Sequence, residues 1–144
     1  MAVTIIMGPA CSGKSFYIKS NYQNSTVIDL YDFQKKGFSN ISDVWKSYED
    51  CAEALKKAIK ENKNVVLEHT LLKKIRREWY ISQIREVTDE NIDIVCIAPS
   101  PETLCKRAKS RNININTEDA KKELSILELP TIDEGYANVK IIKI

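Results

Sequence analysis

The sequence lacks any long hydrophobic run. None of its apolar stretches approaches the roughly 20 residues that a helix needs to cross a bilayer, so we expect no membrane segment. The apolar stretch Ala2–Met7 has no basic flank and leads directly into a glycine-containing loop, which is atypical of a signal peptide. Together these absences predict a cytoplasmic protein.

Paired cysteines and a strong net charge are also missing. The four cysteines, at positions 11, 51, 96 and 105, form no CxxC pair, so we expect reduced thiols in a cytoplasm rather than disulfides or a cysteine metal site. The formal net charge is only +2. The molecule as a whole therefore has no strong attraction for nucleic acid, and any basic site must be local. Nothing in the sequence indicates an oligomeric state.

The length of 144 residues suits one domain, and we expect residues 1–144 to form a single one. Short β-branched and apolar runs predict five strands. These runs are Val3–Met7, Thr26–Leu30, Val65–Glu68, Ile92–Ala98 and Val139–Ile142.

Helical patterns separate these strands. The segments are Lys14 to about Ser20, Val44–Ile59, Ile75–Val87, one opened by Ser100 and Pro101, and one opened by Thr117–Asp119. We expect Ser42 to cap the second of them and residues 37–40 to form a loop. Strands that alternate with helices predict an α/β fold with a five-stranded, mainly parallel sheet between two helical layers. Ligands of such sheets bind beyond the carboxyl ends of the strands.

A phosphate-binding loop follows the first strand and opens the first helix. It fits the pattern GxxxxGK[ST] with Gly8, Pro9, Ala10, Cys11, Ser12, Gly13, Lys14 and Ser15. Backbone amides of such a loop surround phosphate oxygens, the lysine adds positive charge at the β- and γ-phosphates, and the hydroxyl binds Mg²⁺. The loop predicts a P-loop NTPase fold that binds ATP or GTP with Mg²⁺, and we assign the next residue, Phe16, to the same nucleotide site.

Cys11 lies inside this loop and has two interpretations. It is either a small residue that fits the turn, or a thiol whose pKa the loop amides and Lys14 lower enough to make it sensitive to oxidation.

Further motifs follow in a fixed order along the chain. They are Val27–Gln34 after the second strand, Glu68–Leu71 after the third, Ala98–Arg111 after the fourth, and Leu129–Tyr136 before the last. With the phosphate loop, they resemble the polynucleotide-kinase-like branch of P-loop kinases (the AAA_33 and zeta-toxin-related group). The resemblance extends from Val3 to about Ile142.

The resemblance implies that a carboxylate after the second strand acts on an acceptor hydroxyl. The family has an Asp where this sequence has Tyr31, a second Asp that aligns with Asp32, and an Arg where this sequence has Gln34. Asp29 and Asp32 both remain candidates for the base. Each is equally well explained as a carboxylate that caps a turn.

The third motif implies a metal site and leaves the role of its histidine open. Glu68 keeps the carboxylate that the family places near the Mg²⁺ water shell, whereas Leu71 replaces the family's Asn. His69 is the only histidine. A single histidine at a strand end is more often a packed or surface residue, and a catalytic base is the alternative. The basic run Lys73–Arg77 is best explained as a solvated helix face, with one residue available to touch acceptor phosphate.

The fourth motif implies a helical lid over ATP. Arg107 and Arg111 match the family's two lid arginines and would share one helical face. Arginine suits this place because it stays charged and can contact two phosphoryl oxygens at once. The alternative is a basic surface helix. The Leu129–Tyr136 segment matches a stretch that is distinctive of this branch, and we expect it to pack near the nucleotide edge of the sheet.

Three functions fit these motifs. The first is an ATP-dependent kinase that phosphorylates the 5′-hydroxyl of a nucleic acid, with Lys14, Asp29 or Asp32, Arg107 and Arg111 as its catalytic residues. The second is a kinase for a nucleoside, a nucleotide or another small hydroxyl acceptor. The third is a nucleotide-binding regulatory protein with little transferase activity. The departures at Tyr31, Gln34 and Leu71 all lie on the acceptor side, so they weaken the first function without affecting ATP binding.

Overall fold

The computed structural model describes residues 1–34 and 41–144. The loop expected at residues 37–40 lies outside these described residues. Within them, five parallel strands form one sheet in the order β2-β3-β1-β4-β5. The strands are β1 (Val3–Met7), β2 (Thr26–Asp29), β3 (Val65–His69), β4 (Ile92–Ala98) and β5 (Asn138–Lys143).

The strand predictions are confirmed with small changes at the ends. β1 lies at the centre of the sheet and all five of its residues are buried, as its β-branched and apolar composition requires for a strand covered on both faces. Leu30 does not extend β2; it begins a 3₁₀ turn, η1 (Leu30–Phe33), which the Asp29 side chain caps by accepting from the Tyr31 amide.

Helices follow the strands as expected. They are α1 (Lys14–Asn21), α2 (Ile41–Lys60), α3 (Lys74–Arg85), α4 (Pro101–Ser110) and α5 (Thr117–Ile126), with a further 3₁₀ turn, η2 (Ile132–Glu134). Ser100 caps α4 with Pro101 in its first turn, as predicted. The prediction that Ser42 caps α2 is wrong, because α2 begins at Ile41 and Ser42 lies inside its first turn.

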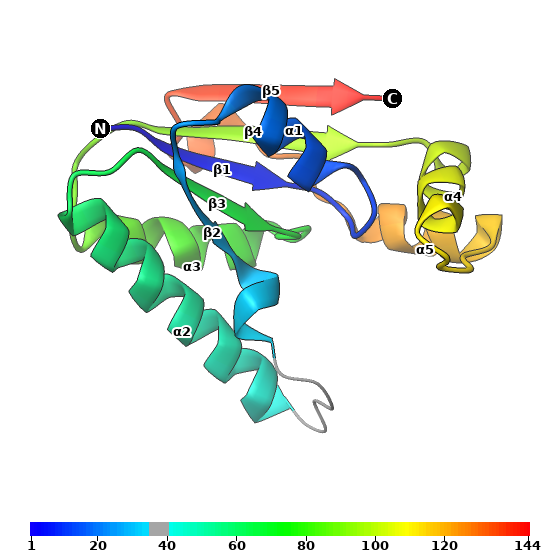
Figure 1. The fold of residues 1–144 in the computed structure, drawn as a ribbon, viewed down its shortest axis with the longest axis horizontal. Coiled ribbons are helices and arrows are strands. Elements are labelled where there is room, and N and C mark those ends of the chain that lie inside the picture. The colour runs from blue at the N-terminus through cyan, green and yellow to red at the C-terminus, as the bar shows by residue number, and fades with distance from the viewer. Residues whose placement is uncertain (35–40) are drawn as a thin grey trace.

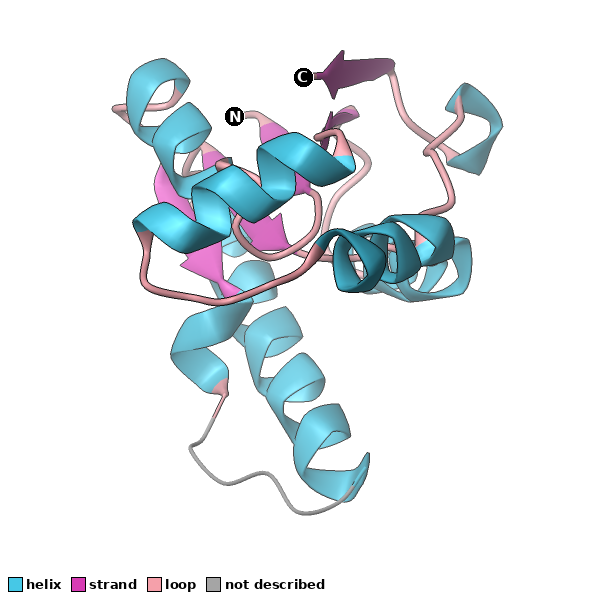
Figure 2. Cartoon of the chain, turned by 90° about the vertical axis from the view of Figure 1, so that its right-hand side faces the viewer, coloured by secondary structure: helices cyan, strands magenta, loops and turns pink. Residues whose placement is uncertain are grey.

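Helices cover both faces of the sheet, so the expected three layers are present (Figures 1 and 2). On one face, Val3, Ile5 and Met7 pack against α2 and α3. On the other face, Ile6 packs with Ile18 of α1. Alternate side chains of β1 therefore point to opposite helical layers, as the period of a strand dictates.

α4 and α5 lie beyond the carboxyl ends of the strands, beside the loop between β1 and α1 (Figure 1). Leu104 and Ala108 of α4 form a small core there with Ala120 of α5 and Cys11 of the loop. This arrangement places a helical pair over the edge of the sheet where ligands of parallel sheets bind. Over the described residues, the search for a helix long and apolar enough to span a membrane finds none.

Candidate active site

The loop between β1 and α1 has the backbone geometry of a phosphate cradle. Gly13 has φ +100°, a conformation that side chains rarely adopt, and it stands at the start of α1. A Cβ on Gly8 would lie 2.6 Å from the Ile97 carbonyl oxygen, so the chain passes too close to β4 for any other residue. Both glycines of the motif are therefore required by the fold, and the free amides at the start of α1 suit an anion.

Lys14 folds back over this loop. Its Nζ donates to the carbonyl oxygens of Gly8 and Pro9, at 2.9 Å each. Burial lowers the pKa of the ammonium, and the nearby carboxylates of Glu68 and Asp29 act in the opposite direction. The charge is thus held at the mouth of the cradle, where a phosphate would be a better partner than two neutral carbonyls.

Ser15 and Glu68 meet at the carboxyl edge of the sheet. The Ser15 hydroxyl donates to Glu68 Oε2 at 2.8 Å, and burial raises the pKa of the Glu68 carboxyl. Among the described residues there is no group of three or more His, Cys, Asp or Glu side chains that could hold a metal by themselves. The pair nevertheless fits Mg²⁺, which is usually held by one or two protein oxygens while phosphates and waters complete its shell.

The two candidate bases occupy different environments. Asp29 is half-buried and stands opposite Glu68 in the β2–β3 register, and its pKa is raised, chiefly by burial. Asp32 is exposed on η1. Asp29 is among the groups whose charge acts on Lys14, and Asp32 is not. The structure thus brings Asp29, Glu68 and Lys14 together.

Both predicted lid arginines reach the loop. Arg107 of α4 donates to the Ser12 carbonyl oxygen, and Arg111 Nη1 lies 4.0 Å from Cys11 Sγ. α4 ends at Ser110, and Arg111 is its C-cap. The two guanidinium groups therefore approach the loop from the last turn of the helix and from its end.

Two other residues of the predicted nucleotide site differ in exposure. The Phe16 side chain is 77% exposed, so its ring points to solvent and only its backbone belongs to the first turn of α1. Cys11 is buried at φ +65° against Leu104, Ala108 and Ala120. This packing favours the interpretation of Cys11 as a small residue that fits the turn.

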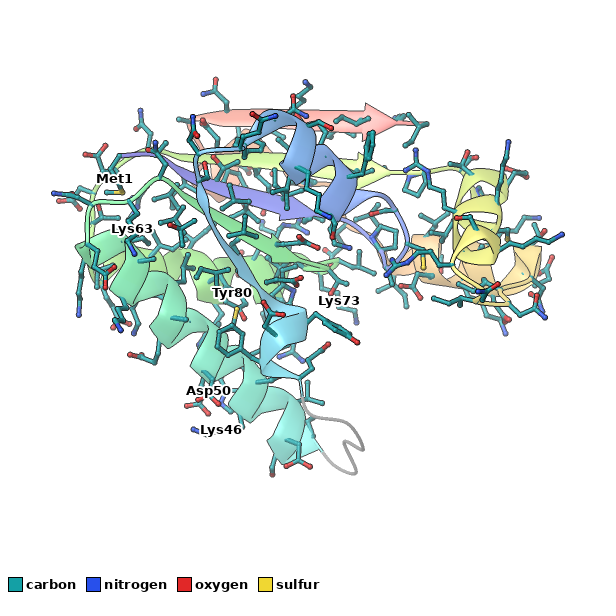
Figure 3. The ribbon with its side chains drawn as sticks, viewed as in Figure 1. Met1, Lys46, Asp50, Lys63, Lys73 and Tyr80 are labelled. Atoms are coloured by element: carbon teal, nitrogen blue, oxygen red, sulfur yellow. The ribbon has the colours of Figure 1, made fainter. Side chains whose placement is uncertain are left out.

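His69 is buried among aromatic rings and is not placed as a base. Its ring lies edge-on to Tyr48 and Tyr80, with centroids 4.9 and 5.0 Å away; Figure 3 labels Tyr80, between the sheet and α2. Its Nδ1 accepts from the Leu71 amide at 3.3 Å, and Nε2 is buried with no hydrogen-bond partner among the described residues. Burial lowers the pKa of the imidazole to about 3, so the ring is neutral near pH 7 and carries its proton on Nε2.

A mainly apolar, open surface groove of about 590 Å³ lies next to the start of α4. The residues that line it are Ala98, Pro99, Ser100, Leu124, Leu127, Leu129, Lys143 and Ile144.

A family model, AAA_33, described as an AAA domain, matches residues 3–129 of this chain. The chain belongs to the AAA_33 family. This confirms the resemblance to P-loop kinases that the motifs indicated. No curated protein matches the sequence.

Solved structures resemble this AAA_33 chain in fold. A sugar kinase from Janibacter sp. has a TM-score of 0.73 at 16% identity, over 99% of this chain and 85% of that one. A gluconokinase from Sinorhizobium meliloti has a TM-score of 0.66 at 17% identity, over 99% and 82%. A chain of the Pnkp1/Rnl/Hen1 RNA repair complex has a TM-score of 0.71 at 16% identity, over 88% of this chain and 43% of that one. At these identities the likeness shows the shared P-loop kinase fold.

One residue of the basic run Lys73–Arg77 in this AAA_33 chain is not a solvated surface residue. Arg77, at the end of the basic run assigned to a solvated face, is fully buried and forms an ion pair with Glu134. The neighbouring Lys73 and Arg76 are exposed, as expected; Figure 3 labels Lys73, near the end of β3. Spacing along α3 alone could have placed Arg77 with buried Tyr80 and Ile84, three and seven residues later.

Proposed function

We propose that this chain is a magnesium-dependent phosphotransferase that moves the γ-phosphate of ATP, or of GTP, to a hydroxyl group of an acceptor. The observation that carries the proposal is the convergence of Lys14, the Ser15–Glu68 pair and Arg107 on one loop at the carboxyl edge of the sheet. Phosphoryl transfer depends mainly on positioning and charge neutralisation, which such a group of side chains supplies.

We assign places to the phosphates, the base and the metal ion. The loop amides and Lys14 would hold the phosphates, and the open apolar groove lined by Ala98 and Leu127 would take the base. Ser15 and Glu68 would hold Mg²⁺, which neutralises charge on the phosphate oxygens when it is bound. Arg107 and Arg111 would contact the phosphoryl group from the side of α4.

We assign Asp29 as the general base. Its burial raises the pKa of the carboxyl, and a raised pKa improves a carboxylate as a proton acceptor. Its position opposite Glu68 puts it on the strand beside the metal-site carboxylate. Asp32 is a turn residue in this assignment.

The acceptor is either a nucleic-acid 5′-hydroxyl or a small hydroxylated molecule, and one observation favours the small molecule. Leu71 stands where the polynucleotide-kinase-like motif has Asn, and it is buried, with 1% of its surface exposed. An apolar side chain packed in the core has no polar group to offer a nucleic-acid chain end. The small acceptors to consider are nucleosides, nucleotides and sugars.

Transfer of label from γ-labelled ATP, with Mg²⁺, tests the proposal. The acceptors are a 5′-hydroxyl oligonucleotide, a set of nucleosides and nucleotides, and a set of sugars, with Lys14→Ala as the inactive control. We expect label on a small acceptor. Label on the oligonucleotide alone would support the polynucleotide-kinase function instead. Tight nucleotide binding without transfer to any acceptor would support a regulatory protein and contradict the transferase proposal.

A further inference from the structure

A buried ion pair connects the C-terminal part of the chain to α3. Arg77 Nε and Nη2 donate to Glu134 Oε1 and Oε2, at 2.8 and 3.0 Å, and the two side chains are 0% and 1% exposed. Glu134 also accepts from the Thr131 amide and the Tyr136 hydroxyl. The carboxylate is therefore fully hydrogen-bonded, as a charge in this environment must be.

The third nitrogen of the Arg77 guanidinium contacts a strained turn. Arg77 Nη1 donates to the Leu71 carbonyl oxygen at 2.9 Å and to that of Leu72 at 3.4 Å. Leu71 has φ +42°, which is unfavourable for a residue with a side chain. Its amide is held by His69 Nδ1. Hydrogen bonds to both the amide and the carbonyl of Leu71 therefore hold the turn after β3 in its conformation.

This turn also contacts the phosphate loop. The carbonyl oxygen of Thr70, the residue before Leu71, accepts from the Gly8 amide at 3.3 Å. Gly8 is the first residue of the loop, and the same strand end carries Glu68. A shift of the turn would therefore move the partner of Gly8.

We propose that Arg77 and Glu134 are positioning residues for the phosphate loop. Through the Leu71 carbonyl, the pair fixes the turn whose Thr70 carbonyl holds the Gly8 amide. Neither side chain belongs to the proposed nucleotide site. The inference rests on the proposed nucleotide site, but its structural half, the fixing of Gly8, can be measured without any ligand.

A double variant, Arg77→Met with Glu134→Leu, separates positioning from stability. A buried ion pair can often be replaced by apolar residues of similar size without loss of stability, but methionine cannot donate to the Leu71 carbonyl. We expect the double variant to melt within a few degrees of the wild type. We also expect its Gly8 amide to exchange about tenfold faster than in the wild type, with the Ile94 amide of β4 as the reference for global unfolding. Mg·ATP should bind to the double variant about tenfold more weakly than to the wild type.

A matched control perturbs the same helix away from the turn. Lys56 of α2 contacts Gln83 and Glu86, at and just beyond the end of α3, at 2.9 and 3.4 Å. Lys56→Met should lower the melting temperature and leave the exchange of the Gly8 amide unchanged.

Wild-type exchange at Gly8 in the folded double variant would overturn the positioning role. If the double variant does not fold, exchange in Arg77→Lys is measured instead. Lysine keeps the positive charge near Glu134, but its single nitrogen cannot donate to both oxygens of the carboxylate and to the Leu71 carbonyl as the guanidinium does. Faster exchange at Gly8 in Arg77→Lys supports the role, and unchanged exchange overturns it. Failure of the wild type to bind Mg·ATP would contradict the proposed function and leave the exchange measurement to decide this inference.

Discussion

Asp29 and Asp32 are close in sequence but differ in what surrounds them. Asp29 lies beside Glu68 on the neighbouring strand and is half-buried, whereas Asp32 is exposed on η1. The sequence could not choose between them, because the choice depends on which strand lies beside β2. The parallel pairing of β2 with β3 supplies that information.

Replacing each aspartate with asparagine tests the assigned base. Asp29→Asn should lower kcat by about 10²- to 10⁴-fold, the usual contribution of a general base, and Asp32→Asn should change it little. Steady-state kinetics with the acceptor found by label transfer give both values. A large loss in Asp32→Asn with wild-type rates in Asp29→Asn would reverse the assignment.

His69 makes the stability of the protein depend on pH. Its folded-state pKa is lowered by burial to about 3, below the ordinary value near 6.5. Between pH 6.5 and about 3, His69 is therefore protonated in the unfolded chain but neutral in the folded protein. The stabilisation is present above pH 6.5 and is lost as the pH falls from there toward 3.

Denaturation of the wild type and of His69→Gln at pH 7 and pH 5 measures this effect. The free energy of unfolding of the wild type should fall by about 2 kcal/mol more than that of the variant, which has no imidazole to protonate. Because His69 is the only histidine, the difference between the two proteins isolates it. Equal losses would show that the ring is already accessible to protons in the folded state.

α4 brings a charged side chain to the loop and is held there by its apolar face. Leu104 and Ala108 pack on Ala120 of α5, and Arg107 donates to the Ser12 carbonyl. The motif predicted both the helix and the approach of its arginines to the nucleotide loop. The helix ends at Ser110, so Arg107 lies in its last turn and Arg111 is its C-cap.

Arg107→Met should lower kcat by about 10²- to 10³-fold, the range found when one group that stabilises transition-state charge is removed. Mg·ATP affinity should change much less. The matched control is Lys109→Met, which removes an exposed charge from the same helix. Equal effects of the two substitutions in steady-state assays would mean that α4 contributes only general positive charge.

The strands were the most predictable elements, because β-branched runs such as Val3–Met7 mark buried strands directly. The start of α2 was not predictable from Ser42, since a serine in the first turn and a serine at the cap have the same local sequence signal. The Arg77–Glu134 pair joins residues 57 positions apart. A basic run on a predicted helix gives no sign of such a partner.

The molecule as a whole gathers its candidate chemistry at one edge. β1, β2 and β3 end beside one another, so Gly8, Asp29 and Glu68 become neighbours although they are distant in sequence. α4 and α5 lie over this edge (Figure 1). The phosphate motif predicted the donor half of the site, and the topology of the sheet adds the carboxylates that face it.

Equilibrium titration of the protein with Mg·ATP tests the donor site most directly. The wild type should bind nucleotide, and Lys14→Ala should bind it at least about 100-fold more weakly, a difference of about 2.7 kcal/mol, because the Nζ that now bonds the Gly8 and Pro9 carbonyls is lost. Circular dichroism would confirm that the variant is folded. Equal affinities in the two proteins, or no binding by the folded wild type, would contradict the assignment of Gly8–Ser15 as the nucleotide site.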